Sequence, residues 1–161
     1  MILRTAFLIA ILTSGLMVLS AEDSIPGVFT SAQAEAGRAD YERTCERCHT
    51  PSLLGRKGGP NELPPLTSLS LADQKFIGHH GFVFVPPLAG KTFLDRWGAK
   101  TAAELIARFQ ITVDDGFFGF ENITEETTVN ITAYVLQVNG AQAGSQRLTR
   151  ATGDVVNSIT R

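Results

Sequence analysis

The sequence predicts an all-α fold, with helices near both ends of the chain and long loops between them. Three observations lead to this prediction: helical spacing of residues toward each end, a middle rich in proline and glycine, and no convincing strand alternation. The chain has 161 residues, of which 43% are hydrophobic and 19% charged, as is typical of a folded globular protein. Its formal net charge of -2 provides no basic field for nucleic acid.

The first 21 residues are predicted to be a secretory signal peptide. Arg4 precedes an apolar run over residues 6–19, small residues follow at positions 20 and 21, and the next charge is Glu22. An uncleaved anchor stays open as the alternative, because residues 5–21 approach the lower limit of roughly 17 residues for crossing a bilayer. Residues 22–31 then form a linker. In both cases the rest of the chain is expected outside the cytoplasm, in the periplasm.

The first helix is predicted over residues 30–45, which are rich in Ala and Glu. Gly37, Tyr41 and Cys45 are spaced four apart and therefore share one helical face. Residues 50–100 hold most of the prolines and many glycines. Proline lacks a backbone donor and fixes its φ angle, so this segment is predicted to form long loops without long regular elements.

Two further helices are predicted from capping boxes. Thr101 and Glu104 open a short helix that places Leu105 and Phe109 on its inner face. A second box is predicted from Asn122 to Glu125 at the start of the last helix. Apolar residues in that helix follow the i, i+3, i+4, i+7 pattern, and a glycine ends it: Ile131, Tyr134, Val135, Val138 and Gly140. Residues 141–161 are polar and small, and we expect a loosely ordered tail.

The residues best suited to bind a cofactor lie between Cys45 and His49. The sequence has only two cysteines, and they are separated by two residues and followed directly by a histidine. Two thiols on one helical turn can each add to one vinyl group of the same haem, and the next residue can present an imidazole nitrogen to the iron. The motif therefore predicts one haem c, attached through Cys45 and Cys48, with His49 as the proximal iron ligand.

The cysteine pair has three other possible interpretations. A thioredoxin-like dithiol would require a βαβ context, which the sequence lacks. A zinc site would require a fourth ligand, which only His79 or His80 could supply. A structural disulfide would leave His49 unexplained. The haem interpretation is favoured because it accounts for all three residues of the motif and agrees with export.

Residues 32–140 carry motifs that resemble those of the class I c-type cytochromes. The motifs are G-x-x-x-Y-x-x-x-C-x-x-C-H from Gly37 to His49 and I-T-A-Y-V-L from Ile131, and P-P-L-A-G-x-x-F-x-x-x-W from Pro86 resembles the cytochrome subunits of periplasmic quinoprotein dehydrogenases. The resemblance implies a cytochrome c fold, in which the first and last helices cross beside the haem and Gly37 allows close approach to Tyr134. Trp97 is then either a core residue or a donor to a haem propionate.

The sixth iron ligand departs from the family pattern. The family normally provides a methionine in the loop before the last helix, whereas residues 111–122 contain no Met, His, Lys or Cys, and both methionines lie in the export segment. Asp114 and Asp115 in that loop are poor candidates, because burying a carboxylate is costly. Either His79 or His80, flanked by glycines, is a candidate distal ligand that would lower the potential. Otherwise the sixth position is open or filled by water and is screened by phenylalanines.

Two function classes follow from these features. The first is a periplasmic electron-transfer protein, not an enzyme, whose partner is a periplasmic dehydrogenase or a respiratory cytochrome. The alternative is a haem-based small-ligand binder or haem enzyme with an open sixth position. Contact with a membrane is expected only if the signal segment is uncleaved.

Overall fold

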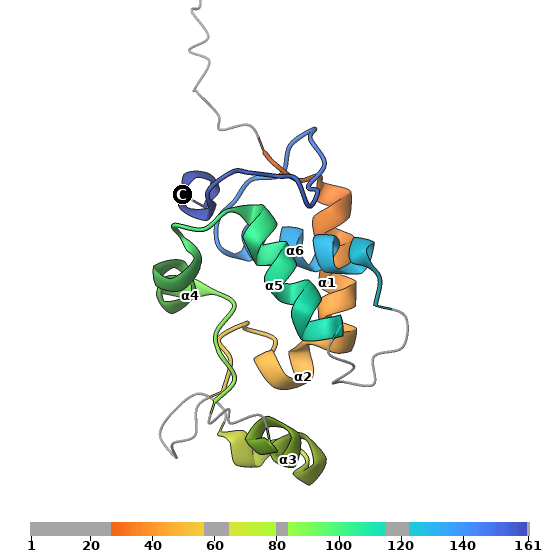
Figure 1. Cartoon of the computed structure of the whole chain (residues 1–161), viewed down its shortest axis with the longest axis vertical. Helices are drawn as coiled ribbons and strands as arrows, with labels where there is room; N and C mark the ends of the chain where they lie inside the picture. Colours follow the sequence, from red (N-terminus) through yellow and green to blue (C-terminus); the bar gives the residue numbers. More distant parts are fainter. Residues whose placement is uncertain (1–26, 57–64, 80–83, 115–122, 161) are drawn as a thin grey trace, which may run out of the picture.

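Two helices, α1 (Ser31–Thr44) and α6 (Glu125–Val138), pack against each other and form the centre of the fold (Figure 1). The structure is a computed structural model that describes residues 27–56, 65–79, 84–114 and 123–160. The helix α5 (Ala102–Asp114) packs on the side of α6. The fold is therefore organised around the first and last long helices of the chain, as the sequence predicts.

Short helices complete the described part of the chain. No strand occurs within those ranges, and the only sheet-like pairs in them are two isolated bridges, Arg56 with Val85 and Thr101 with Val155. The prediction of an all-α class is confirmed at this level. The remaining elements are α2 (Glu46–His49), the 3-10 helix η1 (Leu66–Ser68), α3 (Leu71–His79), α4 (Gly90–Trp97) and α7 (Val156–Ile159).

The helix starts follow local capping chemistry. In α1 the hydroxyl of Thr30 accepts from the backbone N–H of Gln33, and the Gln33 side chain accepts from the N–H of Thr30. The predicted box at the start of α5 is confirmed, because Glu104 accepts from the N–H of Thr101 at 2.8 Å. The box predicted from Asn122 to Glu125 is wrong. Thr124 is the cap of α6 and pairs with Thr127, which moves the start of the helix two residues along the chain.

Gly37 lies at the crossing of α1 and α6. A Cβ added to Gly37 would overlap the backbone carbonyl of Asn130, one helical turn before Tyr134. Tyr134 packs against Tyr41, with ring centroids 5.4 Å apart. Val138 continues the apolar pattern of α6 but is 42% exposed. The absence of a side chain at Gly37 is what allows the two backbones to approach closely.

The main hydrophobic core lies around α1, α5 and α6. Leu105 is fully buried and Phe109 is half-buried against the core, as their predicted inner-face positions require. Trp97 at the end of α4 also packs against this core. A second, smaller cluster contains Leu69 and Val85 and lies beside Cys48.

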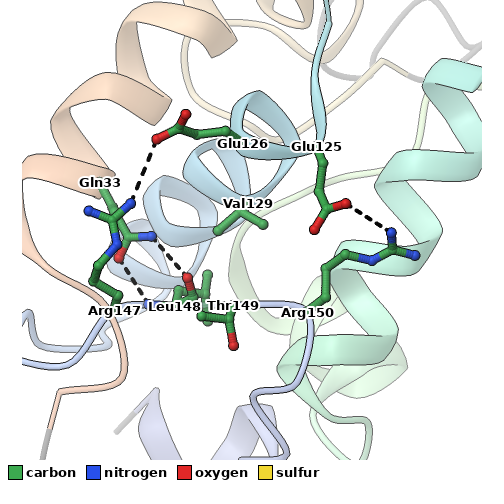
Figure 2. A pocket seen from close by; sticks show the side chains of 8 residues that line it. All are labelled: Gln33, Glu125, Glu126, Val129, Arg147, Leu148, Thr149 and Arg150. Atoms are coloured by element: carbon green, nitrogen blue, oxygen red, sulfur yellow. Dashed lines mark hydrogen bonds and ion pairs between the residues drawn. The ribbon is translucent and has the colours of Figure 1, made fainter.

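The segment after α6 is ordered against the core, which corrects the expectation of a loosely ordered tail. Leu148, Val156 and Ile159 are buried. The Gln33 side chain bonds both the N–H and the carbonyl of Leu148, and Arg147 and Arg150 reach the carboxylates at the start of α6 around an open depression (Figure 2). Sequence periodicity missed this packing because apolar residues are sparse in this segment, and because Leu148 and Val156 are held by hydrogen bonds to Gln33 and Lys100, which are far away in the sequence.

The helix α3 lies at one end of the molecule, away from the crossing of α1 and α6, and α2 lies between them (Figure 1). An ion pair of 3.2 Å joins Arg47 of α2 to Asp73 of α3. Within the described ranges, no helix is long and apolar enough to cross a bilayer. The predicted export segment, residues 1–21, lies outside those ranges, so its nature stays a prediction.

Candidate functional site

The two cysteines lie one helical turn apart at the junction of α1 and α2. Cys45 is the last cap residue of α1, and its carbonyl accepts from the N–H groups of Cys48 and His49 at 3.1 and 2.9 Å. Residues three apart on a helix are neighbours on its surface. Both thiols are free and half-buried. The fold thus presents two unbonded thiols from one turn, directly followed by an imidazole.

The two thiols have different surroundings. Cys45 packs against the main core, and its sulfur lies 3.3 Å from the hydroxyl of Thr44. Cys48 packs against the smaller cluster beside Val85. Burial raises the pKa of both thiols above the ordinary value, so they are protonated at neutral pH. A dithiol tuned for redox exchange would instead need a lowered pKa on one thiol.

The His49 side chain is held in a defined tautomer. Its Nδ1 lies 2.9 Å from the carbonyl oxygen of Pro86, and because a carbonyl can only accept, Nδ1 carries the proton. The lone pair is then on Nε2, which has no hydrogen-bond partner within the described part of the chain. Burial lowers the pKa of His49 to about 4, so the ring is neutral. A neutral imidazole with one nitrogen bonded to a carbonyl is the arrangement typical of a metal ligand.

The Pro86 carbonyl reaches His49 because residues 53–56 pair with residues 85–88. Arg56 and Val85 exchange two backbone hydrogen bonds of 2.9 and 2.8 Å, and the N–H of Leu88 donates to the carbonyl of Leu53 at 2.7 Å. Gly55 has a φ of 73°, and a Cβ added there would overlap the Val85 carbonyl. The glycine therefore permits the close pairing that brings Pro86 to the histidine.

The turn after His49 is held in an unusual backbone conformation. Thr50 has a φ of 69° and Leu53 has a φ of 60°, and both residues are buried. Such angles are uncommon for residues other than glycine, and for a β-branched residue they are costly. The hydroxyl of Tyr41 donates to the carbonyl of Thr50 at 2.6 Å and so links this turn to α1. Burial strongly raises the pKa of Tyr41, which keeps the hydroxyl protonated as the donor.

Arg56 stabilises the end of α2. Its Nε donates to the carbonyl of Cys48 at 3.1 Å, and one terminal nitrogen donates to the carbonyl of Arg47 at 2.9 Å. The other terminal nitrogen donates to the hydroxyl of Ser68. The last carbonyls of a helix lack partners within the helix, and the guanidinium supplies them here. Sequence reasoning missed Arg56 and the role of Pro86, because nothing in a periodic pattern marks a side chain that bonds to a distant backbone group.

The distal side of the site stays a prediction. His79 is the last residue of α3 and Asp114 the last of α5, but the positions of their side chains are not described. His80 and residues 115–122, which include Asp115 and the phenylalanines, lie outside the described residues. Among the side chains that the structure does describe, no group of three or more His, Cys, Asp or Glu residues converges to hold a metal ion.

No protein-family model matches this sequence, and no curated protein or solved structure matches it.

Proposed function

We propose that this chain is a periplasmic electron-transfer protein that carries one covalent c-type haem. The observation that carries the proposal is the state of His49, which directly follows the two free thiols of one turn and whose Nδ1 bond to Pro86 leaves Nε2 available. The residues fit the group: two protonated, unbonded thiols for two vinyl carbons and one oriented neutral imidazole for iron. A zinc site or a dithiol would use only part of this arrangement.

Each residue has a defined part in the proposed site. Cys45 and Cys48 would hold the haem by thioether bonds, and Nε2 of His49 would be the proximal ligand. The Pro86 carbonyl fixes the imidazole plane and increases the donor strength of Nε2. A bound haem supplies a one-electron couple, and an electron carrier then requires an accessible haem edge and a docking face rather than catalytic side chains. Its partner would be a periplasmic dehydrogenase or a respiratory cytochrome.

Haem staining after denaturing electrophoresis tests this proposal. The full chain is produced together with haem-attachment machinery, and we expect a stained band that survives denaturation. Cys45→Ala and Cys48→Ala should weaken or remove the band, and His49→Ala should retain covalent haem but lose the native Soret spectrum. An unstained wild-type chain of normal yield would overturn the proposal.

A ligand-binding haem protein is the second candidate, favoured by the lack of any methionine after Met17. We expect the ferric absorption band typical of methionine ligation to be absent. Spectra of the reduced protein with and without carbon monoxide distinguish the two candidates. A low-spin spectrum that changes in His79→Ala or His80→Ala, and that carbon monoxide leaves unaltered, supports a bis-histidine carrier. A high-spin spectrum that shifts with carbon monoxide supports the open site.

A further inference from the structure

Asn139 is a buried amide that joins the end of α6 to the segment after Pro86. It is the C-cap residue of α6 and is 8% exposed. Its Nδ2 donates to the carbonyls of Leu88 and Val135 at 2.9 and 2.7 Å, and its Oδ1 accepts from the N–H of Gly90 at 3.0 Å. One side chain thus satisfies a donor and an acceptor of residues 88–90 while remaining bonded to its own helix.

The contact at Leu88 is two residues from the carbonyl that orients His49. Backbone pairing with Arg56 holds Val85 on one side of Pro86, and Asn139 and Leu53 hold Leu88 on the other. The intervening residues are both prolines, whose φ angles are fixed by their rings. A short and stiff link of this kind transmits a displacement of Leu88 to the Pro86 carbonyl.

We infer that Asn139 is a positioning residue for the proximal ligand: it holds the Pro86 carbonyl in line with Nδ1 of His49 and thereby sets the donor strength of Nε2 toward iron. The inference rests on the proposed function for its effect on iron, whereas the effect on the imidazole itself does not depend on haem. A stronger Nδ1–H bond makes the imidazole a better donor and favours ferric iron. Loss of the Asn139 contacts should therefore raise the midpoint potential.

Gln33 provides a matched control elsewhere in the molecule. It is also a buried amide, and it bonds the N–H and the carbonyl of one distant residue, Leu148, at 2.9 and 3.0 Å (Figure 2). That contact joins α1 to the C-terminal segment and does not involve Pro86 or its neighbours. Gln33→Ala therefore removes a buried amide that bonds a distant backbone segment, together with its capping bond to the N–H of Thr30. Both contacts are at the start of α1, the opposite end of that helix from Cys45, and neither involves residues 85–90.

The experiment compares Asn139→Ala, Asn139→Ser and Gln33→Ala in the full haem-bearing chain. The serine variant is a milder change, because its hydroxyl can still bond the Val135 carbonyl but is too short to reach Leu88 as well. We measure the midpoint potential and the ring nitrogen NMR signals of His49. Both Asn139 variants should shift the ferric–ferrous equilibrium about threefold to tenfold toward the ferrous form and weaken the Nδ1–H signature. Gln33→Ala should leave both unchanged.

The outcomes separate this inference from the proposed function. Unchanged His49 signals and potential in the Asn139 variants, or equal shifts in Gln33→Ala, would overturn the positioning role. If the wild-type chain contains no haem, the proposed function fails. The His49 ring signals of the same purified full-length variants then still decide whether Asn139 controls the bond to Pro86.

Discussion

The crossing of α1 and α6 and the turn that carries His49 are stabilised in different ways. At the crossing, Gly37 lies against the backbone of Asn130, and buried side chains surround the contact. The stability of this region therefore depends on how closely side chains fill the space between the helices. At the turn, the cysteines and His49 are only half-buried, and directional bonds such as that from Arg56 fix their positions. Changes at the crossing should therefore reduce stability, whereas changes at the turn should mainly alter the orientation of Cys45, Cys48 and His49.

The largest loss of stability is expected from Gly37→Val. The added side chain meets the backbone of Asn130, which cannot move without shifting α6, so we expect the free energy of unfolding to fall by about 3 kcal/mol or more. Chemical denaturation measures the change. Ala36→Val is the matched control, because Ala36 is exposed on the same helix and should lose less than about 1 kcal/mol. Equal losses in both variants would refute the close approach of the helices.

Tyr41 connects the two regions, and we expect Tyr41→Phe to cause a smaller loss of stability. The change keeps the buried ring but removes the donor to the Thr50 carbonyl, so we expect a loss of about 1–2 kcal/mol in the free energy of unfolding. Tyr134→Phe is the control, because its ring is only half-buried and its change should be near zero. If the two variants were equally stable, the bond from Tyr41 would have no part in holding the turn.

Arg56→Ala should cause the smallest loss of stability of the three changes. For that small loss, its effect on the site should be the largest. Removing the guanidinium leaves the last carbonyls of α2 without their donors, and we expect about 1 kcal/mol of destabilisation. On the proposed function, haem incorporation should also fall and the Soret band should change. Arg56→Lys should recover little of the lost stability, since a single ammonium group cannot reproduce the several donors of the planar guanidinium.

Arg43→Ala serves as the charge control for Arg56. Arg43 forms an exposed ion pair with Asp40, and such pairs contribute little. Its variant should match the wild-type protein in both stability and spectrum. An Arg56→Ala protein with a wild-type spectrum and normal haem incorporation would show that the orientation of α2 does not depend on this guanidinium.

The parts of the fold that the sequence could predict are those decided locally. The start of α1 and the box at Thr101 follow from side chains three residues apart. Local rules fail where two candidates compete within a few residues, as Asn122 and Thr124 do at the start of α6. The motif from Cys45 to His49 is likewise local, so its residues could be named from the sequence as a candidate site.

The remaining features depend on contacts between distant residues. His49 and Pro86 are 37 residues apart, and Gln33 and Leu148 are 115 apart. Neither contact leaves a periodic signal, because each involves a single side chain and a backbone group. For the same reason the sequence gives no sign that Leu148 is held against the start of α1.

The backbone of the turn after His49 has a consequence for hydrogen exchange. Thr50 and Leu53 occupy conformations that typically cost about 1–3 kcal/mol each, so the turn persists only because its surroundings enforce it. The amide of Gly55 donates to the carbonyl of His49 at 3.0 Å across this turn. The turn should open only when Tyr41 and the core no longer hold the strained residues, and it should not form again without them. The Gly55 amide should therefore exchange only as fast as the whole domain unfolds, even though it lies in a loop.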